Sequence, residues 1–222
     1  MDLFRKIAII VGVLFITATV AGIVSGIFLG PRNESDYLTA ISANENQVII
    51  SAFFYAIMAV AVAGIAIVIY PVLKKYNEVL AIGYVGARLV EGILFAVGVT
   101  ALLTLITLSQ EFVAAGAPDA SYFQTFGTVL KAAGDWAYML GELAFFLSAL
   151  MLYYLLYKTK LVPQWLSGLG IIGAIIWPVG SLSLAGPTYS GYFYIIIFVQ
   201  EMILAVWLIV KGFNPQVIKS KS

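Results

Sequence analysis

The sequence predicts an all-α membrane protein, a single domain spanning residues 1–222 and built as a bundle of six transmembrane helices with both termini in the cytoplasm. Three observations lead to this fold class. Hydrophobic residues make up 62% of the chain and charged residues 10%, whereas a soluble domain has about half and about a quarter. The apolar residues form six long runs, and the basic residues collect on one side of these runs.

Each run is long enough to cross a bilayer as a helix. About 20 apolar residues span a hydrocarbon layer of about 30 Å, because an α-helix rises about 1.5 Å per residue. Helices satisfy their own backbone hydrogen bonds in lipid, and the runs lack the two-residue alternation of a barrel strand. The predicted spans are residues 6–30, 47–70, 79–109, 126–157, 166–185 and 192–211.

Local signals refine these helices. The first run follows Arg5 and Lys6, but it exceeds the apolar core of a secretion signal, about 7 to 15 residues, so we expect an uncleaved first helix. Ser121 and Gln124 resemble a capping box, which starts the fourth helix before the hydrocarbon and makes it the longest. Pro178 lies inside the fifth run and predicts a kink. The other prolines fall at or beyond predicted helix ends: Pro31, Pro71, Pro118, Pro163, Pro187 and Pro215.

The distribution of charge predicts the orientation. Lys and Arg stay on the cytoplasmic side of a membrane, so the basic side is predicted to be cytoplasmic. That side carries Arg5, Lys6, Lys74, Lys75, Lys158, Lys160, Lys211, Lys219 and Lys221. The opposite loops contain one basic residue, Arg32, and the acidic residues Glu34, Asp36, Glu45, Glu111 and Asp119. Tyrosines and tryptophans near the inner boundary, Tyr153 among them, are predicted to form an aromatic belt.

Residue types that are missing narrow the chemistry. The chain has no cysteine and no histidine, which removes disulfides, thiolate nucleophiles, the commonest metal ligand and the usual neutral-pH base. A net charge of +1 gives no general attraction for nucleic acid. We therefore expect no nucleic-acid partner and no cofactor.

Ionisable residues inside the spans are the main candidates for function, because a charge at the bilayer centre costs roughly 2.5 to 3.5 kcal/mol. These polar residues are Arg88 and Glu91 in the third span, Lys131, Asp135 and Glu142 in the fourth, and Gln200 and Glu201 in the sixth. Glu91, Glu142 and Glu201 fall near mid-depth. Together with Tyr138, the residues of the fourth span form one polar stripe from the outer surface inward, because residues three or four apart share a helix face. We expect the third, fourth and sixth helices to meet around a polar centre and the first, second and fifth to be peripheral.

Such a centre has a proton-handling or a structural interpretation. Three carboxylates and one guanidinium cannot all be ionised in a dry interior, so at least one Glu is expected to be protonated at neutral pH. A carboxyl group of this kind can release a proton or exchange it for a cation, as in coupled transporters. Alternatively, Arg88 and the glutamates form a network of salt bridges whose only role is to hold the helices together. A metal site of three glutamates is opposed by Arg88, and no Glu-x-x-His motif provides a di-iron centre.

Small residues in the first span, Ala18, Gly22 and Gly26, predict close helix packing. The partner helix can belong to this chain or to a second subunit, and the oligomeric state stays open.

Four segments resemble those of one prokaryotic family: residues 31–47, 70–80, 155–173 and 201–214. The run K-x-x-L-V-P-x-W-L-S-G-x-G from Lys158 and the terminal W-L-I-V-K-G from Trp207 are distinctive together. On these segments the chain is similar to the domain of unknown function 4386 family. The resemblance implies a six-span protein of a bacterial or archaeal plasma membrane, and it supplies no activity and no catalytic residues.

Three functions remain open from the sequence. The favoured one is a transporter, channel or ligand-binding protein whose polar centre handles a proton, a cation or a small polar solute. A membrane enzyme acting on a lipid or isoprenoid with carboxylate acid and base groups is the second. A non-catalytic sensor or partner subunit is the third. Membrane lipids are expected to surround the chain in each case.

Overall fold

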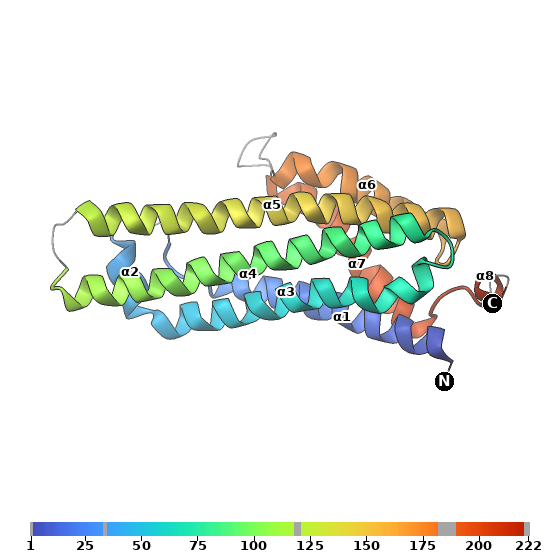
Figure 1. Ribbon diagram of the computed structural model, residues 1–222, viewed down its shortest axis with the longest axis horizontal. Coiled ribbons are helices and arrows are strands. Elements are labelled where there is room, and N and C mark those ends of the chain that lie inside the picture. The colour runs from blue at the N-terminus through green and yellow to red at the C-terminus, as the bar shows by residue number, and fades with distance from the viewer. Residues whose placement is uncertain (1, 33–34, 118–120, 182–189, 220–222) are drawn as a thin grey trace.

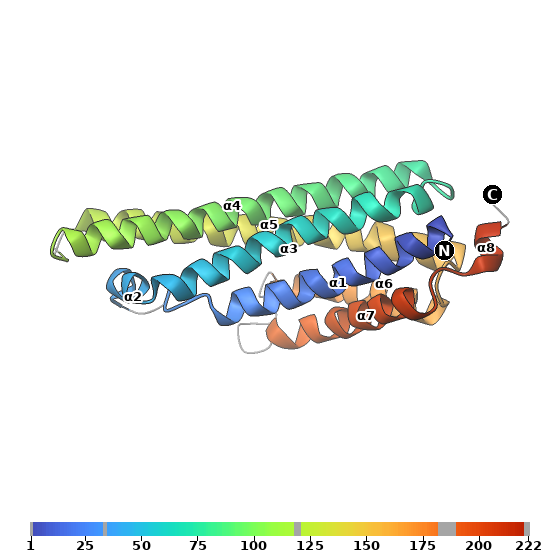
Figure 2. The same cartoon turned by 90° about the horizontal axis from the view of Figure 1, so that it is seen from below.

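The protein is an elongated bundle of helices that run along one long axis (Figures 1 and 2). The computed structural model describes residues 2–32, 35–117, 121–181 and 190–219, and this part contains helices and no strand. The helices are α1 (Leu3–Ile27), α2 (Tyr37–Ala43), α3 (Glu45–Leu73), α4 (Glu78–Ala114), α5 (Ser121–Thr159), α6 (Gln164–Ser181), α7 (Ser190–Val210) and α8 (Pro215–Lys219).

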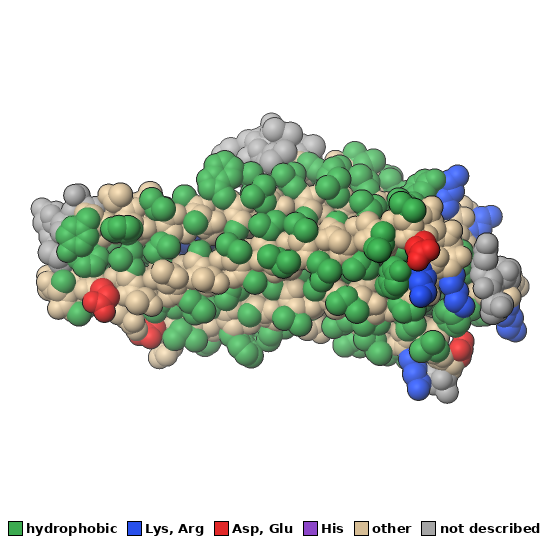
Figure 3. Space-filling model, viewed as in Figure 1, with side chains coloured by type: hydrophobic (Ala, Val, Ile, Leu, Met, Phe, Trp, Pro, Cys, Tyr) green, Lys and Arg blue, Asp and Glu red, His purple; other side chains and the backbone are tan. Residues whose placement is uncertain are grey.

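The helices confirm the all-α membrane fold. Four of them, α1, α3, α4 and α5, are long and apolar enough to cross a bilayer, and α6 and α7 contain shorter apolar stretches. The space-filling view shows apolar side chains along most of the length of the bundle (Figure 3). The chain is therefore a polytopic helical membrane protein. The shorter helices lie at the fifth and sixth predicted spans, and the count of six crossings stays a prediction.

Helix boundaries follow the local signals with one exception. Helix α5 begins at Ser121 and has 39 residues, so it is the longest of the described helices, as predicted. The placement of Pro71 beyond a helix end is wrong, because α3 continues to Leu73 and contains this proline in its last turn. A proline at this position still removes one intrahelical hydrogen bond, and the helix ends two residues later. Helix α6 runs through Pro178, whose kink stays a prediction, and Pro118, Pro187, Glu34 and Asp119 lie outside the described residues.

Both termini lie at the same end of the bundle (Figures 1 and 2). Most of the lysines and arginines visible in Figure 3 also gather at this end. An even number of crossings places both termini on one side of a membrane. Which side is cytoplasmic stays a prediction from the distribution of basic residues.

The six long helices form a closed ring. Neighbours pack in the order α1, α3, α4, α5, α6 and α7, and α7 returns to pack on α1. Short helix α2 covers α4 at the end of the bundle away from the termini (Figure 2). Every long helix thus has two neighbours and one face toward the ring interior, so the expectation that the first, second and fifth spans are peripheral is wrong.

Helix α1 approaches α7 most closely at Gly12, where an added Cβ atom would lie 2.6 Å from the carbonyl oxygen of Ala205. The small residues singled out in the sequence behave differently. A Cβ atom on Gly26 would meet nothing within 4 Å, and one on Gly22 would meet only the side chain of Met58. The expectation of close packing is thus confirmed at Gly22, where the Cβ atom would lie 2.9 Å from Sδ of Met58 on α3, and wrong at Gly26, which borders a cavity.

Candidate functional site

The interior of the ring holds a cavity of about 280 Å³, the central cavity. All six ring helices contribute to its wall. Its charged residues are Arg88 and Glu91 from α4, Glu142 from α5 and Glu201 from α7. Apolar and aromatic side chains make up most of the remaining wall, including Phe15, Met58, Val62, Phe95, Phe145 and Trp177.

Arg88 is the hub of an ion cluster at this cavity. Its Nη1 donates to both carboxylate oxygens of Glu91 at 3.1 Å, and its Nη2 lies 3.8 Å from Oε1 of Glu201. The guanidinium carbon lies 5.1 Å from the ring centre of Phe145, within the range of a cation–π contact. The hydroxyl of Tyr153 donates to Oε1 of Glu201 at 3.4 Å. The cluster therefore holds one positive group between two carboxylates, and Arg88 Nε has no hydrogen-bond partner among the described residues.

Glu142 lines the same cavity outside this cluster. Its side chain is almost fully buried, with an exposed fraction of 4%. The hydroxyl of Tyr138, one turn earlier on α5, hydrogen-bonds to its carboxyl group, while its Oε1 has no hydrogen-bond partner among the described residues. The indole Nε1 of Trp177, also on the wall, has no hydrogen-bond partner within the described part of the chain either. Buried polar groups in folded proteins are nearly always paired, so unpaired groups that face a cavity indicate a place where a ligand or water binds.

Aromatic rings line the same cavity as the Glu142 carboxyl group. Trp177 lies between Phe145 and Tyr194, with ring centres 5.0 Å and 4.4 Å apart. Tyr138, one helical turn before Glu142, stacks on Phe95 at 5.7 Å. These rings come from four helices, α4 to α7, so the ring closure assembles them. The cavity thus combines one acid outside the ion cluster with a largely aromatic wall.

One wall of the central cavity reaches the outer face of the bundle. Ile23 of α1 and Phe198 of α7 both line it, yet their exposed fractions are 48% and 42%. Closer to the termini, Gly12 allows α1 and α7 to touch. The cavity therefore borders the lipid-facing surface between α1 and α7, away from their close contact.

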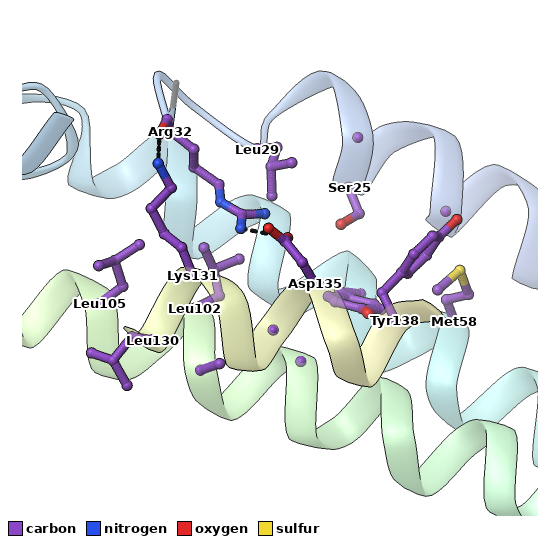
Figure 4. Close-up of a pocket in the computed structure, with 16 residues that line it drawn as sticks. Ser25, Leu29, Arg32, Met58, Leu102, Leu105, Leu130, Lys131, Asp135 and Tyr138 are labelled. Carbon is purple, nitrogen blue, oxygen red and sulfur yellow. Dashed lines mark hydrogen bonds and ion pairs between the residues drawn. The ribbon is translucent and has the colours of Figure 1, made fainter. Parts of the chain in front are cut away.

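A second cavity of about 380 Å³, the outer vestibule, lies toward the end of the bundle away from the termini. In Figure 4, Lys131 and Asp135 of α5 reach across to Arg32, which follows α1. Arg32 Nη2 contacts Oδ1 of Asp135 at 2.8 Å, and Lys131 Nζ donates to the carbonyl oxygen of Arg32. Small residues on three helices leave the space open: Gly22, Ser25, Gly26, Gly98, Ala101 and Gly134.

Tyr138 separates the two cavities. It lines both of them, together with Gly22 and Met58. Figure 4 shows its ring deeper in the vestibule than the pair of Arg32 and Asp135. Phe95, which stacks on Tyr138, also contacts the ring of Tyr55 at 5.7 Å. A tyrosine and phenylalanine layer therefore stands between the outer vestibule and the ion cluster.

Comparison with known protein families identifies the family of the chain. A family model for a domain of unknown function matches residues 10–212, a range that includes most of α1, the other five ring helices and both cavities. The chain belongs to the domain of unknown function 4386 family. No curated protein and no solved structure shows significant similarity to it.

In this family member, the polar residues named from the sequence separate into three places. Arg88, Glu91, Glu142, Glu201 and Tyr138 line the central cavity. Lys131 and Asp135 line the outer vestibule, where the exposed fraction of the Asp135 side chain is 64%. Gln200 lies at neither cavity: it is buried, and its Nε2 donates to the carbonyl oxygen of Leu166 on α6 at 3.2 Å. Among the described residues, no three acidic side chains are arranged to hold a metal ion.

Several residues at the site were not identified from the sequence. Tyr153 was assigned to the inner aromatic belt, which is wrong, because it is fully buried and donates to Glu201. A signal was present, since Tyr153 follows Glu142 by three helical turns and shares its face. Trp177 carried no such signal, because its neighbours Phe145 and Tyr194 lie on other helices.

Proposed function

We propose that this membrane protein binds a small ligand in the central cavity and carries it across the membrane in exchange for a proton at Glu142. Its proposed location is the plasma membrane of a bacterium or archaeon. The observation that carries the proposal is the buried Glu142 carboxyl group, which lies beside the ion cluster but pairs with no cation among the described residues and leaves its Oε1 without a hydrogen bond. The charge of Arg88 is already shared by Glu91 and Glu201, so no fixed cation is left for Glu142.

The solvation of Glu142 supports an exchange mechanism. An ionised carboxylate without a partner is costly in a low-dielectric interior. Glu142 is therefore stable when it holds a proton or when a cationic or hydrogen-bonding ligand lies beside it. Binding of such a ligand releases the proton, and departure of the ligand recovers it. Because the proton and the ligand occupy Glu142 in turn, movement of one is coupled to movement of the other.

Reconstitution tests the proposal. Proteoliposomes with a pH-sensitive dye inside are given an inward proton gradient, and proton entry is measured with and without candidate solutes on the inside. Wild type is expected to show solute-dependent proton entry, and Glu142→Gln is expected to abolish it. Glu78→Gln, at an exposed acid on α4, is the matched control. Equal proton entry in wild type and Glu142→Gln for every solute would remove the basis for transport.

A second candidate function, a membrane enzyme that acts on a lipid or isoprenoid, is favoured by the wall at Ile23 and Phe198. Such a wall admits an acyl chain from the bilayer. The ion cluster disfavours this function, since Glu91 and Glu201 are paired with Arg88 and only one free carboxyl group remains for acid and base catalysis. Turnover of lipid extract that disappears in Glu142→Gln, without solute-dependent proton entry in wild type, would favour the enzyme.

A further inference from the structure

We propose that the ligand of the central cavity is a small lipophilic organic cation, of the quaternary ammonium type, that pairs with Glu142. This inference rests on the proposed function and specifies its substrate class. Four features of the cavity support it: its charge, its aromatic wall, its shortage of oxygen ligands and its border with lipid.

The charges on the wall favour a cation. Arg88 is opposed by Glu91, Glu142 and Glu201, so the ionised wall carries an excess of negative charge. The remaining titratable groups on the wall are the phenols of Tyr138 and Tyr194. The lining residues of α1, α3 and α6 are all uncharged. A monovalent cation therefore neutralises Glu142, whereas an anion would add to the excess.

The aromatic wall favours an organic cation. Ring faces attract cations, and quaternary ammonium groups are recognised in proteins by cages of aromatic rings. Phe145, Trp177 and Tyr194 form a contiguous set with ring centres 5.0 Å and 4.4 Å apart. Phe145 already lies within cation–π range of the Arg88 guanidinium. The wall thus provides both a counterion and polarisable surface for methyl or benzyl substituents.

An inorganic cation fits this wall poorly. Hard cations such as Ca²⁺ take about six to eight oxygen ligands, and Mg²⁺ requires nearly ideal octahedral geometry. Both carboxylate oxygens of Glu91 and Oε1 of Glu201 are engaged by Arg88 and Tyr153, which leaves Glu142 as the carboxylate outside that network. An ammonium ion with apolar substituents needs one counterion and no shell of oxygens.

Size and access limit the ligand further. A volume of about 280 Å³ is slightly below the usual range for small-molecule sites, about 300 to 1,000 Å³. The exposed wall residues Ile23 and Phe198 place this volume next to the bilayer, where lipophilic cations partition. A cation with one aromatic group, such as benzyltrimethylammonium, satisfies both limits.

Carboxyl labelling tests the inference. Dicyclohexylcarbodiimide is a lipophilic reagent: the O–H of a protonated carboxyl group adds across one of its C=N bonds, and the adduct rearranges to a stable N-acylurea. Purified full-length protein is labelled in detergent, with benzyltrimethylammonium or its neutral carbon isostere neopentylbenzene as protectant. The modified residue is identified by peptide mass spectrometry, and Glu142→Gln provides the blank.

We expect labelling of Glu142 that benzyltrimethylammonium slows at least fivefold and neopentylbenzene does not. Trp177→Leu keeps the carboxyl group, so it is expected to be labelled but to need about tenfold more cation for protection, because one ring face is lost. Circular dichroism of each variant checks its fold. If Glu142 is labelled but the cation does not protect it, or the neutral isostere protects equally, the substrate class is wrong and the proposed function stands. If Glu142 is not labelled in folded wild type but is labelled after denaturation, the carboxyl group is sealed and both proposals fail.

Discussion

Removal of the Arg88 charge is the sharpest test of the ion cluster. Arg88→Gln retains a polar side chain but leaves Glu91 without the two hydrogen bonds of 3.1 Å that it now receives. Glu201 loses less, since its distance to Arg88 of 3.8 Å is beyond a hydrogen bond and Tyr153 still donates to it. The variant therefore has one buried carboxyl group that is newly unpaired.

The expected loss of stability follows from this one unpaired carboxyl group. Removal of one partner from a buried ion pair costs about 3 to 5 kcal/mol, because the other charge stays buried and uncompensated. Arg88→Gln together with Glu91→Gln removes the stranded acid, so we expect the double variant to lose only about 1 to 2 kcal/mol, mainly the contact of the guanidinium with Phe145. The two substitutions are thus predicted to be coupled by about 2 kcal/mol or more.

Unfolding in mixed micelles with increasing SDS, followed by circular dichroism, measures these free energies, and thermal unfolding gives an independent value. At about 2 to 4 °C per kcal/mol for a chain of this size, Arg88→Gln is expected to lower the melting temperature by roughly 6 to 20 °C. Lys6→Gln, at an exposed residue, controls for loss of one positive charge. A melting temperature within 2 °C of wild type for Arg88→Gln, or strictly additive effects in the double variant, would refute the reasoning.

Three further predictions concern other parts of the ring. Glu142→Gln should leave the melting temperature unchanged or raise it, since it removes a buried acid that has no cationic partner and keeps a group that can bond to Tyr138. A fall of several degrees would instead make Glu142 structural and favour a sensor or partner subunit. Gly12→Leu should cost about 1 to 3 kcal/mol by pushing α1 away from α7, and SDS unfolding indistinguishable from wild type would argue against that contact. Because the chain lacks cysteine, Lys74→Cys and Glu111→Cys each introduce a single thiol that can be labelled. In intact cells a membrane-impermeant maleimide should modify Glu111→Cys and spare Lys74→Cys. The reverse labelling pattern would show that the predicted orientation is inverted.

The outer vestibule suggests how access to the central cavity is limited. Its ion pair of Arg32 and Asp135 and the ring of Tyr138 lie in series between the outer end of the bundle and Glu142. The polar stripe predicted along α5 therefore continues across two cavities. On the proposed route from the central cavity to this end of the bundle, a ligand would pass the aromatic layer first and the ion pair second.

The membrane class, the helical fold and the identity of the buried charges could all be predicted from the sequence. These properties depend on how each residue is solvated. A run of apolar residues belongs in lipid whatever its neighbours, and Arg88, Glu91, Glu142 and Glu201 are costly in lipid unless they face the protein interior. Periodicity also placed Tyr138 on the face of α5 that carries Glu142.

The partners of these charges were decided by the tertiary structure. Periodicity along one helix does not say which helix comes next around a ring, or how far each is rotated, because packing between side chains of distant segments sets both. That packing joins Arg88 of α4 to Glu201 of α7, directs Gln200 to the backbone of α6, and draws Asp135 to Arg32 beyond the end of α1. It also leaves Glu142 without a fixed cation, beside Trp177 from a helix that periodicity alone placed at the periphery.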